Sequence, residues 1–570
     1  MSDFKFDPLG DLKGVWGHAS TGWKVGLKIG RSWRASRTRA EIGKVYGPEV
    51  ADAVEAAIKA GKDPRPVIER AEKARQEREE RERLLVDPPP LHGSATWAKP
   101  EDLAKVLRGR DAFDSPSSIL LGSYIDEESQ GPQQFAHWDG DGHLLTVAPT
   151  RSGKAVTTII PNLLRYRGSA VVLDPKGELY AATSKWRAEN VGPVYRLAPF
   201  DDGTNPATAN FPRHGFNPLT RVRSQADARS LAEQLFPRDP KSPEFFTDDA
   251  ASFMTALIQF VLDEAPPHRR TLATVHQAAA QPLPEFKVLM QRLMRSRLPA
   301  VVAAADNILG KNGERGLPTF RDTLNSKLAL WGDPAILASV AQHGFDFEAL
   351  KEQPATVYID VPFDLMKPYS PWLRVVLKSA LDAMLRSPAK PEIPVLFVLD
   401  EFLALGPFAE FRDAIRTHAG AGVRLWFFLQ DVGSLELEYP NNGWRPFFNC
   451  SVKQFFGIDD PFTGELIGKF LGNRTVAYRV TNDGGNISAQ NGGWGQDSST
   501  NVSMSSNESI QFTGRPLLTP DEVMELLSDW QDDGWRWGII QMRGPRPFKV
   551  GLVSWNKSEV CRGRFGAFEI

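Results

Sequence analysis

The chain has 570 residues, 41% hydrophobic and 24% charged, which is typical of globular domains and excludes a wholly disordered or fibrous protein. A net charge of −2 excludes a chain-wide basic field for nucleic acid, so any DNA contact has to be a local patch. Two cysteines, Cys450 and Cys561, exclude a disulfide framework, and no apolar run approaches the roughly 20 residues that span a bilayer.

Residues 1–90 are predicted to form an appendage. Residues 11–40 carry seven Lys or Arg side chains against the single acid Asp11, with three tryptophans between them. Basic residues mixed with aromatics suit an anionic lipid surface or a nucleic-acid backbone, although an arm without a specific partner fits the same composition. The Glu/Arg-dense stretch at 66–86 predicts a solvated helix, which the prolines at 88–90 end.

From His92 onward, short apolar runs rich in β-branched and aromatic residues alternate with helical stretches. The pattern predicts strands at 143–148, 169–174, 194–197, 356–360, 395–400, 423–429 and 452–456, with two more near 535–542 and 547–554. Continuously apolar strands alternating with helices predict an α/β fold, in which a parallel-rich sheet is flanked by helices.

The strand at 143–148 leads into a candidate phosphate-binding loop, APTRSGKA at 148–155, and a helix follows. In such loops the backbone N–H groups and the helix N-terminus face the phosphates, and the lysine, here Lys154, adds a positive charge. The residues expected to bind a nucleotide are Pro149, Thr150, Arg151, Ser152, Gly153, Lys154 and Ala155.

The loop departs from the usual G-x-x-x-x-G-K-S/T pattern at two positions. Ala148 replaces the first glycine, and Ala155 replaces the hydroxyl residue that normally ligates Mg²⁺. Without that hydroxyl, the metal keeps an extra water or relies more on a carboxylate elsewhere. Thr158 lies on the same helical face but one turn, about 5 Å, deeper, so we do not expect it to substitute.

The next strand ends in Asp174-Pro-Lys-Gly-Glu178. Asp174 and Lys176 would brace the phosphate loop or face a neighbouring subunit, and a plain strand-turn-helix connection at Gly177 is an equally good interpretation.

Residues 226–350 are predicted to form an all-α domain inserted into the α/β fold, with its first part at 91–225 and its second at 351–570. Helical apolar periodicity excludes a set of long loops here. The expected helices include 245–262, 272–280, 285–295, 298–309 and 319–330.

The apolar strand at 395–400 ends in two acids, Asp400 and Glu401. Because parallel strands open at their carboxyl ends into the ligand crevice, we expect Asp400 to hold Mg²⁺, directly or through water. Glu401 would orient and deprotonate the attacking water. Gln430 ends the following strand and would sense the γ-phosphate, although a polar residue is also ordinary at a strand exit. Lys154, Glu401 and Gln430 are thus the catalytic candidates.

Near the carboxyl end, residues 481–509 are rich in Gly, Ser and Asn and are predicted to be disordered or a mobile loop. Thr519 is a candidate N-cap for a helix that begins with Pro520, with Glu522 completing a capping box.

Nucleotide-driven motors with a phosphate-binding loop often receive an arginine from a neighbouring subunit. The candidates for that role are Arg412, Arg416, Arg424 and Arg515.

Together these motifs resemble the TraG-type coupling ATPases of type IV secretion and conjugation systems. The resemblance spans about residues 91–555 and rests on LHGSATW at 91–97, APTRSGKA at 148–155, IPNLL at 160–164, VVLDPKGE at 171–178, FNPL at 216–219, LDEFLALG at 399–406, AGAGVR at 419–424 with Gln430 and Asp431, and GRPLLTPDEV at 514–523.

The resemblance implies a RecA-like P-loop NTPase that uses ATP and Mg²⁺, with an all-α domain facing the substrate. It implies a homo-oligomeric ring, commonly a hexamer, at the base of a secretion channel, with ATP between subunits. Its partners would be channel components, relaxase-bound DNA and protein effectors. Within the family a loop ending Gly-Lys-Gly is common, so Ala155 is a mild variant. Ala419 stands where some relatives place a trans arginine.

Family members usually carry two transmembrane helices before the His-Gly-Ser-Ala segment, where this sequence has the basic arm. We therefore expect a cytoplasmic chain, peripheral at the inner membrane through anionic lipid or a membrane-protein anchor, or free in the cytosol. The leading hypothesis is an ATP-driven coupling protein that delivers DNA–relaxase or protein substrates to a type IV channel. The alternatives are a cytosolic hexameric FtsK-like DNA translocase and a nucleotide-dependent docking platform without strong ATPase activity.

Overall fold

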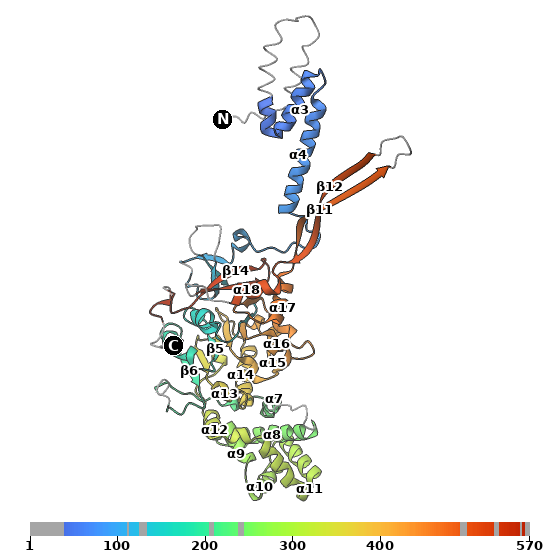
Figure 1. Ribbon diagram of the computed structural model, residues 1–570. Coiled ribbons are helices and arrows are strands. Elements are labelled where there is room, and N and C mark those ends of the chain that lie inside the picture. The colour runs from blue at the N-terminus through green and yellow to red at the C-terminus, as the bar shows by residue number, and fades with distance from the viewer. Residues whose placement is uncertain are drawn as a thin grey trace. The chain divides into compact units, whose positions relative to one another are not determined.

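The computed structural model describes residues 39–110, 113–124, 134–204, 210–236, 244–490, 499–528, 535–558 and 561–564 (Figure 1). The chain divides into two compact units, one formed by Met1–Ala95 with Gly472–Leu517 and the other by Thr96–Leu471 with Leu518–Ile570. Nearly all of the predicted basic arm at 11–40 lies outside the described residues. No helix of the described residues has both the length and the apolar character needed to cross a bilayer.

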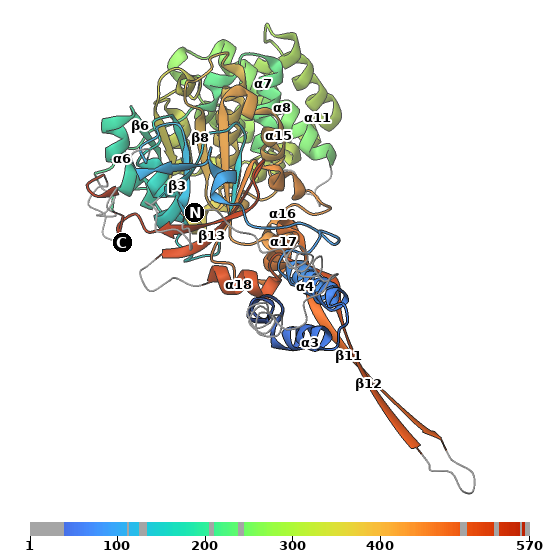
Figure 2. The same ribbon diagram turned by 90° about the horizontal axis from the view of Figure 1, so that it is seen from above.

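Seven strands in the larger unit form a parallel sheet. They are β4 (Leu144–Val147), β5 (Ala170–Leu173), β6 (Val194–Leu197), β7 (Thr356–Ile359), β8 (Val395–Leu399), β9 (Val423–Leu429) and β10 (Val452–Phe455). Their order is β10-β4-β9-β8-β5-β7-β6, and every neighbouring pair is parallel. Every residue of β4, β5, β7, β8 and β9 is buried. Flanking helices cover the sheet (Figure 2), so the predicted α/β fold is confirmed.

Five further strands extend this sheet with antiparallel pairing. They are β1 (Leu107–Gly109), β2 (Ile119–Tyr124), β3 (Gln134–Trp138), β13 (Trp535–Met542) and β14 (Phe548–Val553). β13 joins β10, and the order continues outward as β14-β2-β3-β1. β13 and β14 were predicted from the sequence, and the first three strands were not. These strands are short, and the β2–β3 register shifts between Leu120 and Gly122, which breaks the periodic signal.

The predicted helices of residues 226–350 are present. They are α7 (Gln225–Leu235), α8 (Glu244–Glu264), α9 (Leu272–Ala279), α10 (Leu283–Leu293), α11 (Pro299–Lys327) and α12 (Pro334–Ala341). The predicted helices 298–309 and 319–330 are the two arms of α11, which bends at the non-helical Gly313. By compactness these helices belong to the same unit as the sheet, so their independence as a domain stays a prediction.

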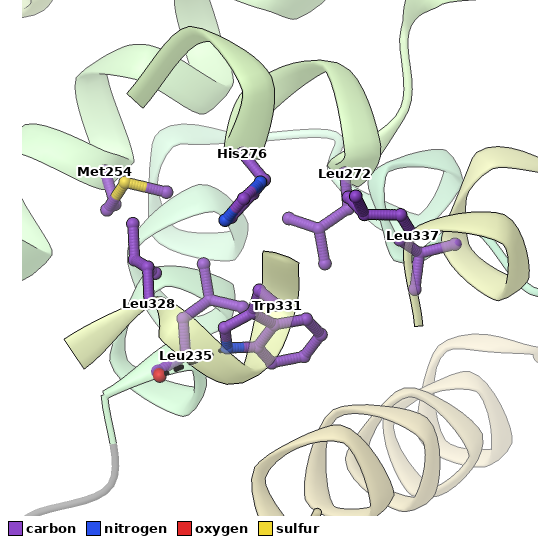
Figure 3. Close-up of a pocket in the computed structure, with 8 residues that line it drawn as sticks. Leu235, Met254, Leu272, His276, Leu328, Trp331 and Leu337 are labelled. Atoms are coloured by element: carbon purple, nitrogen blue, oxygen red, sulfur yellow. Dashed lines mark hydrogen bonds between the residues drawn. The ribbon is translucent and has the colours of Figure 1, made fainter. Parts of the chain in front are cut away.

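An apolar pocket lies among these helices (Figure 3). Its lining includes Met254 of α8, Leu272 and His276 of α9, and Trp331, whose Nε1 donates to Leu235 O at 3.4 Å. Most of these side chains are buried aliphatic or aromatic groups, so the pocket belongs to the packing of the helical region.

The smaller unit contains helices α3 (Pro48–Lys59) and α4 (Arg65–Val86), and α4 confirms the predicted charged helix. Ile42, Ala51, Val54 and Ile68 form a small core between them. On α4, Arg75 pairs with Glu72 at 2.9 Å and with Glu79 at 3.6 Å. These exposed pairs follow the i,i+3 and i,i+4 spacing that the sequence predicted.

The smaller unit also contains a long hairpin of β11 (Asn473–Gln490) and β12 (Ser499–Pro516). This differs from the disordered or mobile segment predicted at 481–509, of which residues 491–498 lie outside the described part. The prediction relied on side-chain composition, but an antiparallel ladder uses backbone N–H and C=O groups, which Gly, Ser and Asn also carry. The base of the hairpin is held by Gly93 O, which accepts from Thr475 N at 3.1 Å.

Candidate functional site

The carboxyl ends of three adjacent strands bring the predicted site residues together. β9 lies between β4 and β8, and all three strands are parallel. The phosphate loop follows β4, Gln430 follows β9, and Asp400 and Glu401 follow β8. Residues that are far apart in the sequence therefore meet at one edge of the sheet, as the crevice rule for parallel strands predicts.

The loop itself is a compact turn closed onto a helical segment. Ser152 closes it, since its hydroxyl donates to Pro149 O at 2.6 Å and its N–H to the same oxygen at 3.3 Å. Arg151 and Gly153 have positive φ values of 61° and 89°. Ala155–Ile159 then form a π-helical turn, which continues as helix α5 (Ile160–Leu163). The loop thus has the turn and the following helix that a phosphate cradle requires.

Lys154 places a positive charge between the two acids of β8. Its side chain is 10% exposed, and Nζ lies 3.5 Å from Glu401 Oε1 and 4.0 Å from Asp400 Oδ1. Among the described residues, Nζ is also one of the buried polar atoms that make no hydrogen bond. A buried ammonium with unused donors beside two carboxylates suits a phosphate and its divalent cation, so the residues fit a nucleotide with Mg²⁺.

The carboxyl of Asp400 is strongly affected by its surroundings. Burial raises its pKa to about 6, against the opposing effect of Lys154, and Oδ1 accepts from Glu401 N at 3.1 Å. Burial makes this carboxyl costly to ionise even with Lys154 nearby. A bound metal cation would favour its ionised form, so the carboxyl is suited to act as a metal ligand.

Asp174, at the tip of β5, is a second buried acid. Burial raises its pKa to about 7, and Oδ2 accepts from Tyr180 N at 2.8 Å. This bond ties the strand to helix α6 (Glu178–Asn190), while Lys176 is exposed. The contact supports the strand-turn-helix interpretation of this segment, and a role for Lys176 toward a neighbouring subunit stays a prediction.

Gln430 connects the loop to Glu401. Its Nε2 donates to both Glu401 carboxylate oxygens, at 3.0 and 2.9 Å, and its Oε1 accepts from the Thr150 hydroxyl at 3.2 Å. Glu401 has a φ of 53°, in the left-handed region that non-glycine residues rarely adopt. Strained conformations of this kind cluster at functional sites, and here the residue lies within the predicted site.

Gly457, which was not singled out from the sequence, also lies against the loop, and Arg536 lies next to Gly457. Gly457 follows β10 with a φ of +69°, and a Cβ built on it would lie 2.7 Å from Ser152 Cβ and 2.5 Å from Arg536 Nη1. Arg536, on β13, is only 3% exposed. Neither residue belongs to a recognisable motif, because the signal is a close approach between chain segments far apart in sequence.

Replacing Gly457 with Ala is expected to weaken nucleotide binding several-fold and to lower the melting temperature. The new methyl meets Ser152 and Arg536, and the positive φ adds about 1 kcal/mol of backbone cost. Fluorescent-nucleotide titration and thermal melting measure the two effects.

Gly203→Ala is the matched control for this variant. Its φ is +77° and nothing lies within 4 Å of the added Cβ, so it carries the backbone cost without the clash. Equal nucleotide affinities in the two variants would show that Gly457 does not shape the loop.

Ala155 leaves the loop without the usual hydroxyl, and the nearby threonines do not replace it. Thr157 Oγ1 donates to Gly153 O at 2.9 Å, and Thr158 is 1% exposed with its hydroxyl 3.3 Å from that of Thr157. The prediction that Thr158 lies too deep agrees with this burial.

Of the four candidate trans arginines, Arg424 is unsuited, which corrects the prediction. It is 2% exposed, stacks over Trp138 at 5.1 Å, and donates to the backbone oxygens of Ser117, Asp139 and Gly140. A guanidinium already used inside its own fold is unable to reach a neighbour's phosphate.

The other three arginines lie elsewhere. Arg416 is exposed on helix α15 (Ala409–Thr417), and Arg412 of the same helix is half-buried. Arg515 lies in the smaller unit, directly opposite Arg474 in the backbone register of the β11–β12 hairpin. Ala419 begins a 3₁₀ turn, Ala419–Ala421, immediately before β9.

Comparisons with known proteins show that this chain is similar to one family. A family model described as "Type IV secretory system Conjugative DNA transfer" matches residues 113–566. Protein VirD4 of Agrobacterium fabrum is 29% identical over 489 residues, which cover 83% of this chain and 67% of that protein. The conjugal transfer protein TraG of Escherichia coli is 26% identical over 475 residues, covering 76% and 71%.

A solved structure has the same fold. Plasmid coupling protein TrwB in complex with a non-hydrolysable ATP analogue superposes with a TM-score of 0.50 at 16% identity, covering 84% of this chain and 100% of that chain. The likeness supports the parallel-rich α/β fold described above.

Proposed function

Because the chain belongs to the family of type IV secretory system conjugative DNA transfer proteins, we propose that it is a coupling ATPase of such a system. It would recruit DNA–relaxase or protein substrates to the secretion channel and use ATP hydrolysis to help move them. The observation that carries the proposal is the position of Lys154, buried between Asp400 and Glu401 where the ends of β4, β9 and β8 meet.

Each residue of the site has a role in this reaction. The backbone of residues 149–155 would bind the phosphates, and Lys154 would add its charge. Asp400 would hold Mg²⁺, directly or through water; when bound, Mg²⁺ neutralises charge on the phosphate oxygens. Glu401 would take the proton of the attacking water, whose oxygen bonds to the terminal phosphorus as the bond to ADP breaks. Gln430 would hold Glu401 and respond to the terminal phosphate.

The working form is proposed to be a homo-oligomeric ring, a hexamer when assembled on the channel. In the larger unit, the exposed Arg416 and the half-buried Arg412 remain the candidates for an arginine supplied in trans. VirD4 and TraG are named for secretion and conjugal transfer, which supports DNA and channel components as partners. The basic arm at 11–40 would hold the protein at the cytoplasmic face of the inner membrane through anionic lipid or a membrane-protein anchor.

The test is ATP turnover by the purified full-length chain, with and without DNA and a cognate relaxase. We expect slow turnover by the chain alone and faster turnover with substrate, because a ring completes the site with a neighbour's arginine. Asp400→Asn should lower turnover in every condition. Nucleotide binding without turnover in all conditions would instead favour a docking platform, and stimulation by DNA without any relaxase or channel requirement would favour a general DNA translocase.

A further inference from the structure

Thr150 makes a contact that a loop binding phosphate through its backbone does not need. Its hydroxyl donates to Gln430 Oε1 at 3.2 Å, and the other end of that amide donates to both oxygens of Glu401. The three side chains therefore form a continuous hydrogen-bonded chain, which we call the Thr150–Gln430–Glu401 chain. It runs from the loop after β4, across the end of β9, to the end of β8.

The chemistry of the three groups gives this chain a direction. An ionised carboxylate only accepts hydrogen bonds, so the donating nitrogen of the Gln430 amide faces Glu401. The amide oxygen is thereby turned toward the loop, where the Thr150 hydroxyl donates to it. With both ends bonded, the amide has one orientation, and it holds both carboxylate oxygens at once. Without the hydroxyl, only one end of the amide would be held.

The acid at the end of the chain has few other restraints. Glu401 has its backbone in the left-handed region, and its carboxylate faces Lys154 Nζ at 3.5 Å. Lys154 is a single charge on a long stem, which attracts the carboxylate without fixing its orientation. The Gln430 amide is the group that sets where both oxygens point.

We propose that Thr150 is a positioning residue. It sets the orientation of the Glu401 carboxylate through the Gln430 amide and so links the state of the phosphate loop to Glu401. This inference rests on the proposed function, in which Glu401 takes the proton of the attacking water. A nucleotide that rearranges the loop around Thr150 would move the far end of the same chain, and the acid would be set only when the loop is in its working geometry.

Thr150→Val and Thr150→Ser test this role, because Val keeps the shape without the hydroxyl and Ser keeps the hydroxyl. Losing a neutral hydrogen bond that orients the acid should lower kcat of Thr150→Val about fivefold to tenfold. KM and the Kd for a fluorescent ADP analogue should change less than about twofold, since backbone N–H groups and Lys154 supply the binding. Thr150→Ser should keep kcat within about twofold of the parent.

Crystal structures of the full-length variants give a second readout that does not depend on turnover. In Thr150→Val the amide is held only at its Glu401 end, so Gln430 Nε2 should no longer keep both Glu401 oxygens at hydrogen-bond distance at once, and in Thr150→Ser both contacts should remain at the present 2.9 to 3.0 Å. An unchanged contact in Thr150→Val, a parallel loss of kcat and affinity, or a failure of Ser to rescue would each overturn the proposal. If the parent chain does not hydrolyse ATP, the proposed function fails, while the contact comparison still decides the positioning role.

Discussion

Replacing Glu401 with Gln is expected to lower ATP turnover about 100-fold to 1,000-fold while nucleotide binding persists, because an amide is unable to take the proton of water. The substitution keeps the volume of the side chain and its oxygen can still accept from Gln430 Nε2, which now lies 3.0 Å from Glu401 Oε1. The fold should therefore survive, and the loss should fall on kcat. Steady-state turnover and a nucleotide titration of the same preparation separate the two quantities.

Glu436→Gln provides the matched control for this prediction. Glu436 is exposed on helix α16 (Val432–Glu438), a few residues beyond Gln430, so the same chemical change is made near the site but outside it. Its turnover should equal that of the parent. If Glu401→Gln retained the parental rate, the assignment of Glu401 as the base would be wrong and another group would have to take the proton.

Replacing Lys154 with Ala is expected to weaken nucleotide binding about 100-fold, since a charge-assisted contact to phosphate in a partly desolvated site contributes about 2–3 kcal/mol. The change also removes the charge that stands between the two acids. Burial already raises the pKa of Asp400 to about 6 against the opposing effect of Lys154, so that pKa should rise further. Fluorescent-nucleotide titration between pH 6 and pH 8 measures the loss.

Lys185→Ala is the control, because Lys185 is exposed on α6 and its substitution removes the same charge at a distance from the loop. Its affinity should match the parent at every pH. Parental affinity in Lys154→Ala would mean that the loop binds phosphate through its backbone alone, or that the nucleotide binds elsewhere.

The central strands and the capping box could be predicted because the signals for them come from residues close together in the sequence. Strands buried on both faces have to be continuously apolar, and the fully apolar β8 begins at the predicted Val395 and ends one residue before the predicted end. The capping box of Thr519 and Glu522 is likewise present, with Thr519 N donating to Glu522 Oε2 at 2.9 Å. Both features depend on residues close in sequence, which is the range over which a pattern carries information.

The features that escaped prediction depend on distant partners. Gly457 reaches the phosphate loop, with Arg536 next to it, only after β10 and β13 have joined the sheet, and nothing beside these residues in the sequence indicates this. Arg424 was one of the four candidates for an arginine supplied in trans, and its bonds to Ser117 and Gly140 join segments too distant in sequence to be predicted. The pairing of Gln430 with Thr150 also depends on strand order, since their contact requires β9 to lie beside β4.

The same strand order determines when the site forms during synthesis. β9 is the last of the three central strands to leave the ribosome, yet it occupies the place between β4 and β8. A nascent chain that stops before residue 423 already contains Lys154 and Asp400, but it lacks the strand that sets them across from one another. Since pairings between distant segments close late and slowly, the polypeptide should acquire its nucleotide-binding ability only after β9 has been synthesised.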